Sequence, residues 1–142
     1  VIAVDYSEAA LVVAKSNAAE LKIRNIECIQ SDWYSTIVGQ RFDVIVSNPP
    51  YIELNDEHLS QGDLRYEPSS ALVSGADGLD AIRIIIAGAK NHLNPNAWLM
   101  IEHGWNQGEA IRKLFAQSGF VEISTEQDLG QRDRVTMGQN PP

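Results

Sequence analysis

The chain has 142 residues and a formal net charge of −8, from 11 lysines and arginines against 19 aspartates and glutamates. Hydrophobic residues make up 44% and charged residues 21%, which is typical of a folded domain and excludes an intrinsically disordered chain. No apolar run reaches the roughly 20 residues that cross a bilayer, so no membrane association is expected. An acidic surface repels phosphate backbones, which disfavours direct binding to nucleic acid.

The first part of the chain predicts a strand, a helix and a second strand. The β-branched run VIAVD at residues 1–5 predicts a short strand, and the second strand is IECIQ at residues 26–30. Ser7 is a suitable N-cap for the helix between them. The apolar residues that recur at helical spacing in this helix are Ala10, Val13, Ala14, Ala18 and Leu21.

A third strand and a long irregular stretch follow. FDVIVSN at residues 42–48 is nearly continuous in apolar residues, which predicts a strand covered on both faces. Residues 52–78 carry no regular pattern, and loops of this length tend to be functional. Helical spacing returns at residues 79–93, before the strand AWLMIEH at residues 97–103.

The last elements complete the fold prediction. A helix over residues 109–118 ends at Gly119, and VEISTEQ (121–127) and RVTMG (134–138) predict an antiparallel strand pair. Strands that alternate with helices indicate a mostly parallel sheet with helices on both faces, a Rossmann-like α/β fold. We expect one domain over residues 1–142.

Polar and aromatic residues stand at four predicted strand ends. They are Asp5, Asp32 with Trp33, the segment 48–51, and Glu102 with His103. In an open α/β sheet, ligands bind beyond the carboxyl ends of the strands. The sequence therefore predicts one site at this edge.

Asp5, Asp32 and Trp33 have the chemistry to hold an adenosine. A carboxylate after a strand can accept hydrogen bonds from ribose hydroxyls, although an acid at a helix start is by itself more often a dipole partner. Asp32 can accept from an exocyclic amine and Trp33 can stack on a purine; a solvated turn acid beside a core tryptophan is the equal alternative.

The string SNPPY at residues 47–51 predicts a rigid pocket for an amide. Two prolines cannot continue a sheet, because each lacks a backbone donor. The Asn48 side-chain oxygen and the Pro49 carbonyl can both accept from one NH2 group, while Tyr51 packs on its flat face. Such a pocket orients a weak nucleophile without a strong base. The alternative is an ordinary Asn-Pro turn.

These motifs resemble the class I S-adenosylmethionine-dependent methyltransferases, and among them the protein-(glutamine-N5) methyltransferases of peptide-chain release factors. The resemblance covers the whole chain. It rests on Asp5, SDW at 31–33, NPPYI at 48–52, YEPSSALVSGADGLD at 66–80 and IEHGWNQG at 101–108. NPPY is shared with enzymes that methylate adenine N6, whereas the block from residue 66 is more specific to the glutamine branch.

The resemblance implies S-adenosylmethionine as the cofactor and requires no metal. By that resemblance, Asp5 would hold the ribose and Trp33 the adenine, with Ser31 and Asp32 alongside. Asn48 would contact both cofactor and substrate.

The resemblance also implies the substrate site. Asn48, Pro49 and Tyr51 would be the catalytic residues. These three residues, with Pro50 and Glu67, would bind the glutamine side chain of a Gly-Gly-Gln loop in a release factor. A cytoplasmic enzyme fits this substrate, and the single cysteine Cys28 fits a reducing compartment.

One departure from the family concerns the start of the chain. The glycine-rich loop of the family and the strand before it are absent, so we expect an incomplete, C-terminal portion of the domain that binds cofactor weakly alone. The family places that strand between the strands at residues 1–4 and 42–47. Another copy of the chain or a rearranged pairing would close the resulting edge.

Three rival functions remain open from the sequence. The closest is glutamine methylation of a ribosomal protein. The segments EHGWNQG and LGQRDRVTMG are more similar to the release-factor branch and favour it. Adenine-N6 methylation of nucleic acid would suit a basic surface better than a charge of −8. A non-catalytic binding module would not need an intact SNPPY string.

Overall fold

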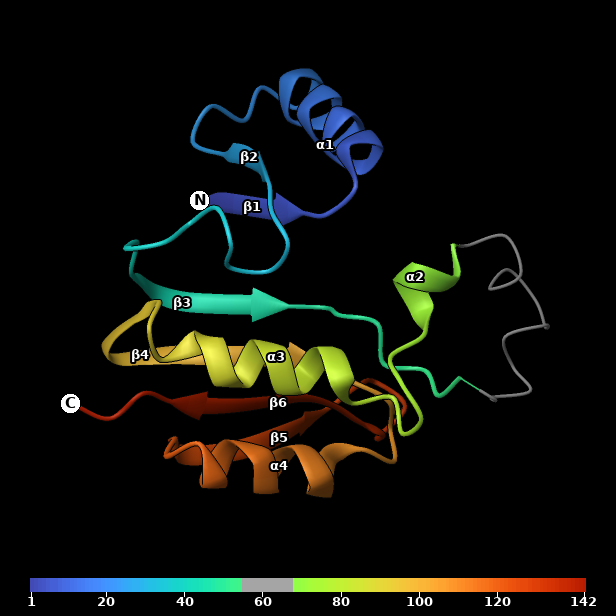
Figure 1. The fold of residues 1–142 in the computed structure, drawn as a ribbon, viewed down its shortest axis with the longest axis vertical. Coiled ribbons are helices and arrows are strands. Elements are labelled where there is room, and N and C mark those ends of the chain that lie inside the picture. The colour runs from blue at the N-terminus through green and yellow to red at the C-terminus, as the bar shows by residue number, and fades with distance from the viewer. Residues whose placement is uncertain (55–67) are drawn as a thin grey trace. The chain divides into compact units, whose positions relative to one another are not determined.

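A computed structural model of the chain describes residues 1–54 and 68–142 (Figure 1). The chain forms two compact units, Val1–Gln40 and Arg41–Pro142, each with its own sheet. The sequence predicts one domain over residues 1–142. That the two units combine into one domain stays a prediction. Glu67, predicted to bind substrate, lies outside the described residues.

The first unit is a parallel strand pair joined by a helix, as the sequence predicts. Strand β1 (Ile2–Asp5) pairs with β2 (Glu27–Gln30), and helix α1 (Glu8–Glu20) connects them. The hydroxyl of Ser7 accepts a hydrogen bond from the Ala10 backbone N–H at 3.2 Å, which confirms the predicted N-cap.

The apolar residues that recur at helical spacing do not mark a buried face of α1. Val13 is 58% exposed and Leu21 lies beyond the end of the helix at 70% exposure, whereas Leu11 is the one buried residue of α1. Leu11, Val12 and Val13 are consecutive, so apolar residues surround the helix and their spacing does not select one side.

The second unit combines a four-stranded mixed sheet with helices. Strands β3 (Phe42–Ser47) and β4 (Leu93–Glu102) are parallel, and β6 (Asp133–Gln139) runs antiparallel to both β4 and β5 (Val121–Gln127). The strand order is β3-β4-β6-β5, which confirms the predicted antiparallel pair at the end of the chain. Its helices are α2 (Ser69–Leu72), α3 (Asp80–Ala89) and α4 (Gly108–Gln117).

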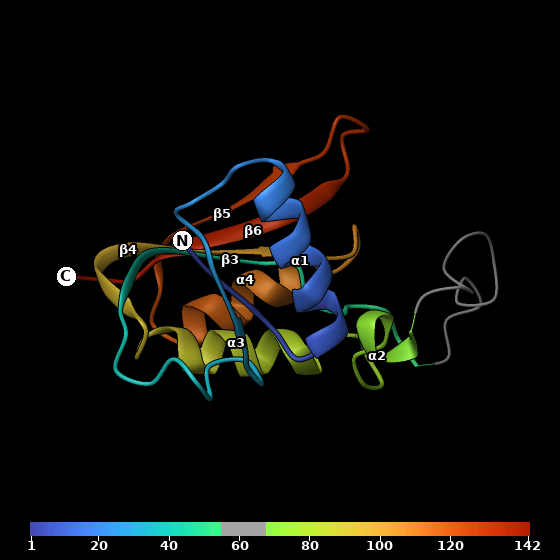
Figure 2. The same ribbon diagram turned by 90° about the horizontal axis from the view of Figure 1, so that it is seen from above.

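Helices α3 and α4 lie on the same face of this sheet (Figure 2). The core beneath them consists of fully buried side chains from α3, β4 and α4: Ile82, Ile86, Leu99, Ile101, Ile111 and Phe115. The Phe115 ring also packs against Phe120 at a centroid distance of 5.1 Å. A Cβ at Gly138 of β6 would lie 2.5 Å from the Phe115 ring, so the glycine leaves room for that ring.

The prediction that strand β3 is covered on both faces is wrong for this unit. Val44 is 49% and Val46 is 74% exposed, although both belong to the apolar run. β3 is the edge strand of its sheet, and α3 and α4 lie together on one face of that sheet. An apolar run indicates burial but does not say how many faces are covered.

The stretch 52–78, predicted to be irregular, contains local structure on its described parts. The short helix α2 follows Pro68, a residue suited to a helix start, and a parallel bridge joins Ile52 to Val73. The next helix is shorter than predicted: it ends at Ala89, because the chain enters β4 at Leu93.

We expect Phe115→Ala to lower the free energy of unfolding by about 3–5 kcal/mol, since the change empties a fully buried ring site between α4 and β6. Gln117→Ala, at an exposed position of the same helix, is the matched control and should change little. Urea denaturation followed by circular dichroism measures both. Equal midpoints for the two variants would contradict this assignment of the core.

Candidate functional site

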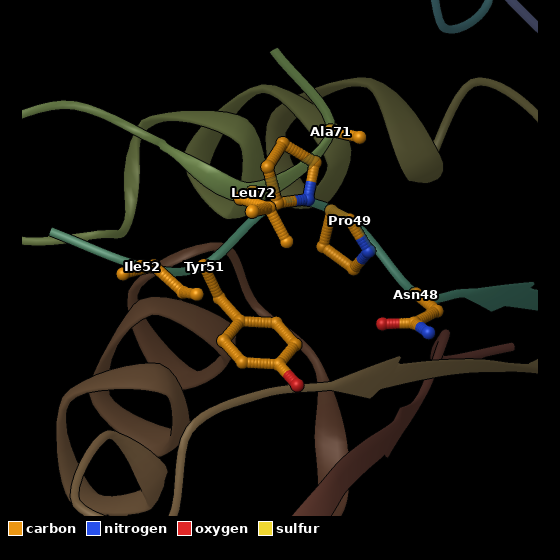
Figure 3. A pocket seen from close by; sticks show the side chains of 7 residues that line it. Asn48, Pro49, Tyr51, Ile52, Ala71 and Leu72 are labelled. Carbon is orange, nitrogen blue, oxygen red and sulfur yellow. The ribbon is translucent and has the colours of Figure 1, made fainter. Parts of the chain in front are cut away.

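The segment after β3 forms one wall of a pocket. Pro49 and Pro50 end the strand, because neither can donate to a sheet ladder. The pocket has a volume of about 250 Å3. Figure 3 shows the side chains that line it: Asn48, Pro49, Pro50, Tyr51, Ile52, Ala71 and Leu72.

The Asn48 amide is available to a ligand. Asn48 is exposed and Pro49 is buried, and the amide of Asn48 and the ring of Tyr51 point toward the same space (Figure 3). Side chain and backbone at this point can therefore offer acceptors to a small polar group, while an aromatic ring bounds the same space. That this space takes a flat carboxamide stays a prediction.

Ala71 and Leu72 form a wall that the sequence prediction did not assign. The wall is held to the SNPPY segment by backbone hydrogen bonds: Ile52 N–H donates to Leu72 C=O at 2.8 Å, and Ser74 N–H donates to Ile52 C=O at 2.9 Å. The block at residues 66–80 was the available signal, but it gave no indication that α2 closes the pocket.

Tyr51 is held as a neutral phenol. Its hydroxyl donates a long hydrogen bond of 3.5 Å to the carboxylate of Glu102, at the end of β4. Burial, and then the negative charge of Glu102, raise the pKa of Tyr51, while Arg134 opposes the rise. Tyr51 is therefore a ring and a hydrogen-bond donor at neutral pH, not a base.

His103 supports the site from within the core. It is fully buried, with Nδ1 2.8 Å from the Gly104 carbonyl and Nε2 2.8 Å from the Thr136 hydroxyl. Burial lowers the pKa of His103, which favours the neutral ring. Since a carbonyl only accepts, Nδ1 carries the proton and Nε2 accepts from Thr136. Both nitrogens are thus occupied, which agrees with a supporting role rather than proton transfer.

In the first unit, the predicted adenosine-binding residues lie at the carboxyl ends of the paired strands β1 and β2. Asp5 ends β1, and its backbone carbonyl accepts from the Ser31 N–H at 3.0 Å, just after β2. Asp5 Oδ1 accepts from the Ser7 N–H at 2.7 Å. Asp5 and Asp32 are both exposed, so their carboxylates are accessible to hydroxyl or amine donors.

Ser31 shapes the turn that carries Trp33. The Ser31 side chain is buried; its hydroxyl donates to the Trp33 carbonyl at 2.8 Å and accepts from the Thr36 N–H at 3.2 Å. Trp33 has a φ of +50°, which non-glycine residues seldom adopt. This turn holds the half-buried Trp33 next to Asp32. The role of these residues in binding an adenosine stays a prediction.

The predicted site residues thus form two groups. Asp5 and Ser31–Trp33 lie in the first unit, and Asn48–Tyr51 with Glu102 and His103 lie in the second. Their convergence on one ligand stays a prediction. Over residues 1–54 and 68–142, no three histidine, cysteine or acidic side chains group as metal ligands would. The helices of the same residues include none with the length and apolar character of a membrane span.

We expect Glu102→Gln to lower the pKa of Tyr51, because it removes the negative charge that opposes phenol ionisation. NMR of ring-labelled tyrosine as a function of pH measures the shift, with Tyr51→Phe to assign the signal. Glu122→Gln, an exposed acid on β5, is the control. An unchanged pKa of Tyr51 in the Glu102 variant would show that the two side chains do not interact.

Comparison with known proteins identifies relatives of the chain. Residues 1–63 match the family described as methyltransferase small domain. The release factor glutamine methyltransferase of Xylella fastidiosa is 54% identical over 141 residues, which is 99% of this chain and 51% of that protein. The chain thus spans about half the length of the curated relatives it matches.

Solved structures share the fold. A methyltransferase from Pyrococcus furiosus superposes with a TM-score of 0.71 at 17% identity, covering 99% of this chain and 62% of that one. A release-factor-specific protein-(glutamine-N5) methyltransferase from Alicyclobacillus acidocaldarius gives a TM-score of 0.54 at 24% identity, covering 99% and 79%. The chain therefore carries the α/β fold of methyltransferases and is homologous to the release factor glutamine methyltransferases along its whole length.

Proposed function

We propose that the protein containing this chain transfers a methyl group from S-adenosylmethionine to the side-chain amide nitrogen of a glutamine in peptide-chain release factors. The observation that carries the proposal is the pocket beside an exposed Asn48, in a chain homologous to enzymes named for this reaction. A cytoplasmic location follows from the proposed substrate.

The first unit would bind the methyl donor. S-Adenosylmethionine supplies an electrophilic methyl group on its sulfonium. The Asp5 carboxylate would accept from the ribose hydroxyls, and Trp33 would stack on the adenine, with Ser31 and Asp32 alongside. Asn48 would contact both donor and substrate.

The second unit would orient the nucleophile. A primary amide nitrogen is a weak nucleophile, because its lone pair is delocalised into the carbonyl. If Asn48 Oδ1 and the Pro49 carbonyl each accept one N–H, the NH2 group is fixed, and its geometry is biased toward the tetrahedral form that can attack a methyl group. Tyr51 would pack on the flat face of the amide.

No strong base takes part in this proposal. Tyr51 is a neutral phenol and His103 is a buried ring with both nitrogens occupied. S-Adenosylmethionine would supply the methyl group and leave as the thioether, and the methylated amide nitrogen would lose one proton to solvent. Orientation, rather than proton abstraction, would therefore supply most of the rate acceleration.

Release factors are the favoured substrate class for two reasons. The relatives are named for release factors, and the net charge of −8 disfavours a nucleic acid. Glutamine methylation of a ribosomal protein uses the same amide chemistry and is the second candidate. The net charge does not distinguish a release factor from a ribosomal protein as the substrate. The experiment therefore compares the two directly.

We expect the full-length protein, given radiolabelled S-adenosylmethionine, to label a release factor but not a ribosomal protein fraction or DNA. Asn48→Ala should reduce the rate by about 100-fold or more, because one of two oriented acceptors is lost. Scintillation counting of the separated substrates measures both.

Asn91→Ala, at an exposed position after α3, is the matched control and should leave labelling unchanged. Label in DNA would overturn the substrate class. Full labelling of the release factor by the Asn48 variant would overturn the mechanism.

A further inference from the structure

The side-chain amide of Gln107 connects three segments of the second unit. Its Nε2 donates to the Tyr51 carbonyl at 2.9 Å and to the Asp77 carbonyl at 3.4 Å. Its Oε1 accepts from the Gly104 N–H at 2.9 Å. Gln107 is only 8% exposed. Both polar atoms of this buried amide are thus bonded to backbone, and one backbone partner belongs to the SNPPY string.

Gln107 stands at the N-cap of α4 but does not cap that helix. The side chain makes no hydrogen bond to the first turn, where a serine, threonine, aspartate or asparagine is normally favoured. Those shorter side chains would not extend as far toward the Tyr51 carbonyl. A glutamine is therefore long enough, and has the N–H donor, to reach the Tyr51 carbonyl from this position.

Gly78 makes this close approach feasible. It has a φ of +72°, which favours glycine, and a Cβ at this position would meet the Tyr51 carbonyl oxygen and lie 2.6 Å from Gln107 Nε2. The Tyr51 carbonyl is therefore enclosed by Gly78 and Gln107 together. The hydrogen bond from Gln107 to this carbonyl is partly buried, so loss of the donor would leave the carbonyl with reduced access to water as a replacement.

The anchored carbonyl lies two residues beyond the proposed acceptor. Only Pro50 separates Tyr51 from Pro49, and its ring fixes φ near −65°, which removes one of the backbone torsions between the two carbonyls. A shift of the Tyr51 carbonyl is then transmitted to the Pro49 carbonyl and to Asn48. A displacement of about 1 Å at a reacting group can reduce a rate about 100-fold.

We infer that Gln107 is a positioning residue of the pocket: its amide N–H fixes the Tyr51 carbonyl and thereby the acceptors at Pro49 and Asn48. The catalytic part of this inference rests on the proposed function. Gln107 is not among the side chains that line the pocket, so its effect should appear as misorientation of a bound substrate. The turnover number should fall, and the KM for the release factor should change little, because the acceptors act on one amide of a large protein substrate.

The test compares Gln107→Glu with Gln117→Glu in the full-length protein. The first change keeps the length and the acceptor for Gly104 but replaces the donor with an oxygen that faces the Tyr51 carbonyl. The second makes the same chemical change at an exposed position of α4. We expect Gln107→Glu to reduce kcat about 10- to 100-fold with little change in KM, and the control to match the wild type. If the introduced carboxylate prevents folding, Gln107→Met removes the donor at similar length.

A second readout does not depend on any substrate. Loss of the anchor should speed amide hydrogen exchange at Ile52 and Ser74, whose N–H groups bond across the bridge beside Tyr51. Exchange in the core of β4 should stay unchanged. Wild-type exchange rates at Ile52 and Ser74 in a folded Gln107 variant would show that Gln107 does not fix the Tyr51 carbonyl. A wild-type kcat would show that Gln107 does not position the acceptors. Failure of the wild-type protein to label a release factor would instead count against the proposed function. The exchange measurement would still test whether Gln107 fixes the Tyr51 carbonyl.

Discussion

The structure of the site depends on one backbone constraint: the chain leaves the edge strand β3 through two prolines and is tied down again immediately afterwards. The prolines stop the ladder, the bridge between Ile52 and Val73 fixes the far end, and Gln107 holds the Tyr51 carbonyl between them. A short segment fixed at both ends has few conformations. That rigidity lets backbone and side-chain acceptors occupy defined positions without a bound ligand, which is the preorganisation that catalysis by orientation requires.

Two ring side chains of this region, Tyr51 and His103, favour their neutral forms. Burial and the charge of Glu102 raise the pKa of Tyr51, and burial lowers the pKa of His103, whose two ring nitrogens both have partners. Neither ring is set up as a base, which suits the proposed reaction, whose nucleophile needs orientation more than deprotonation. The same groups tie the pocket to β4 and β6, so its geometry depends on the packing of the mixed sheet.

The sequence predicted features that depend on local chemistry. Ser7 caps α1, the prolines end β3, and the last two strands pair antiparallel, as expected from capping, missing donors and turn residues. Features that depend on distant partners were missed or wrong. The exposed faces of α1 and β3 depend on what covers them. The contacts of Leu72 with Ile52 and of Gln107 with Tyr51 join residues 20 or more positions apart. No single-sequence pattern encodes such contacts.

The central claim is that Asn48 Oδ1 and the Pro49 carbonyl accept hydrogen bonds from one substrate amide. A crystal structure of the full-length protein with S-adenosylhomocysteine and a peptide containing Gly-Gly-Gln tests it most directly. The account predicts that the glutamine amide nitrogen lies about 2.7–3.2 Å from both oxygens, with the Tyr51 ring on its flat face. An amide nitrogen bonded to water or to a side-chain base, with Asn48 turned away, would contradict it.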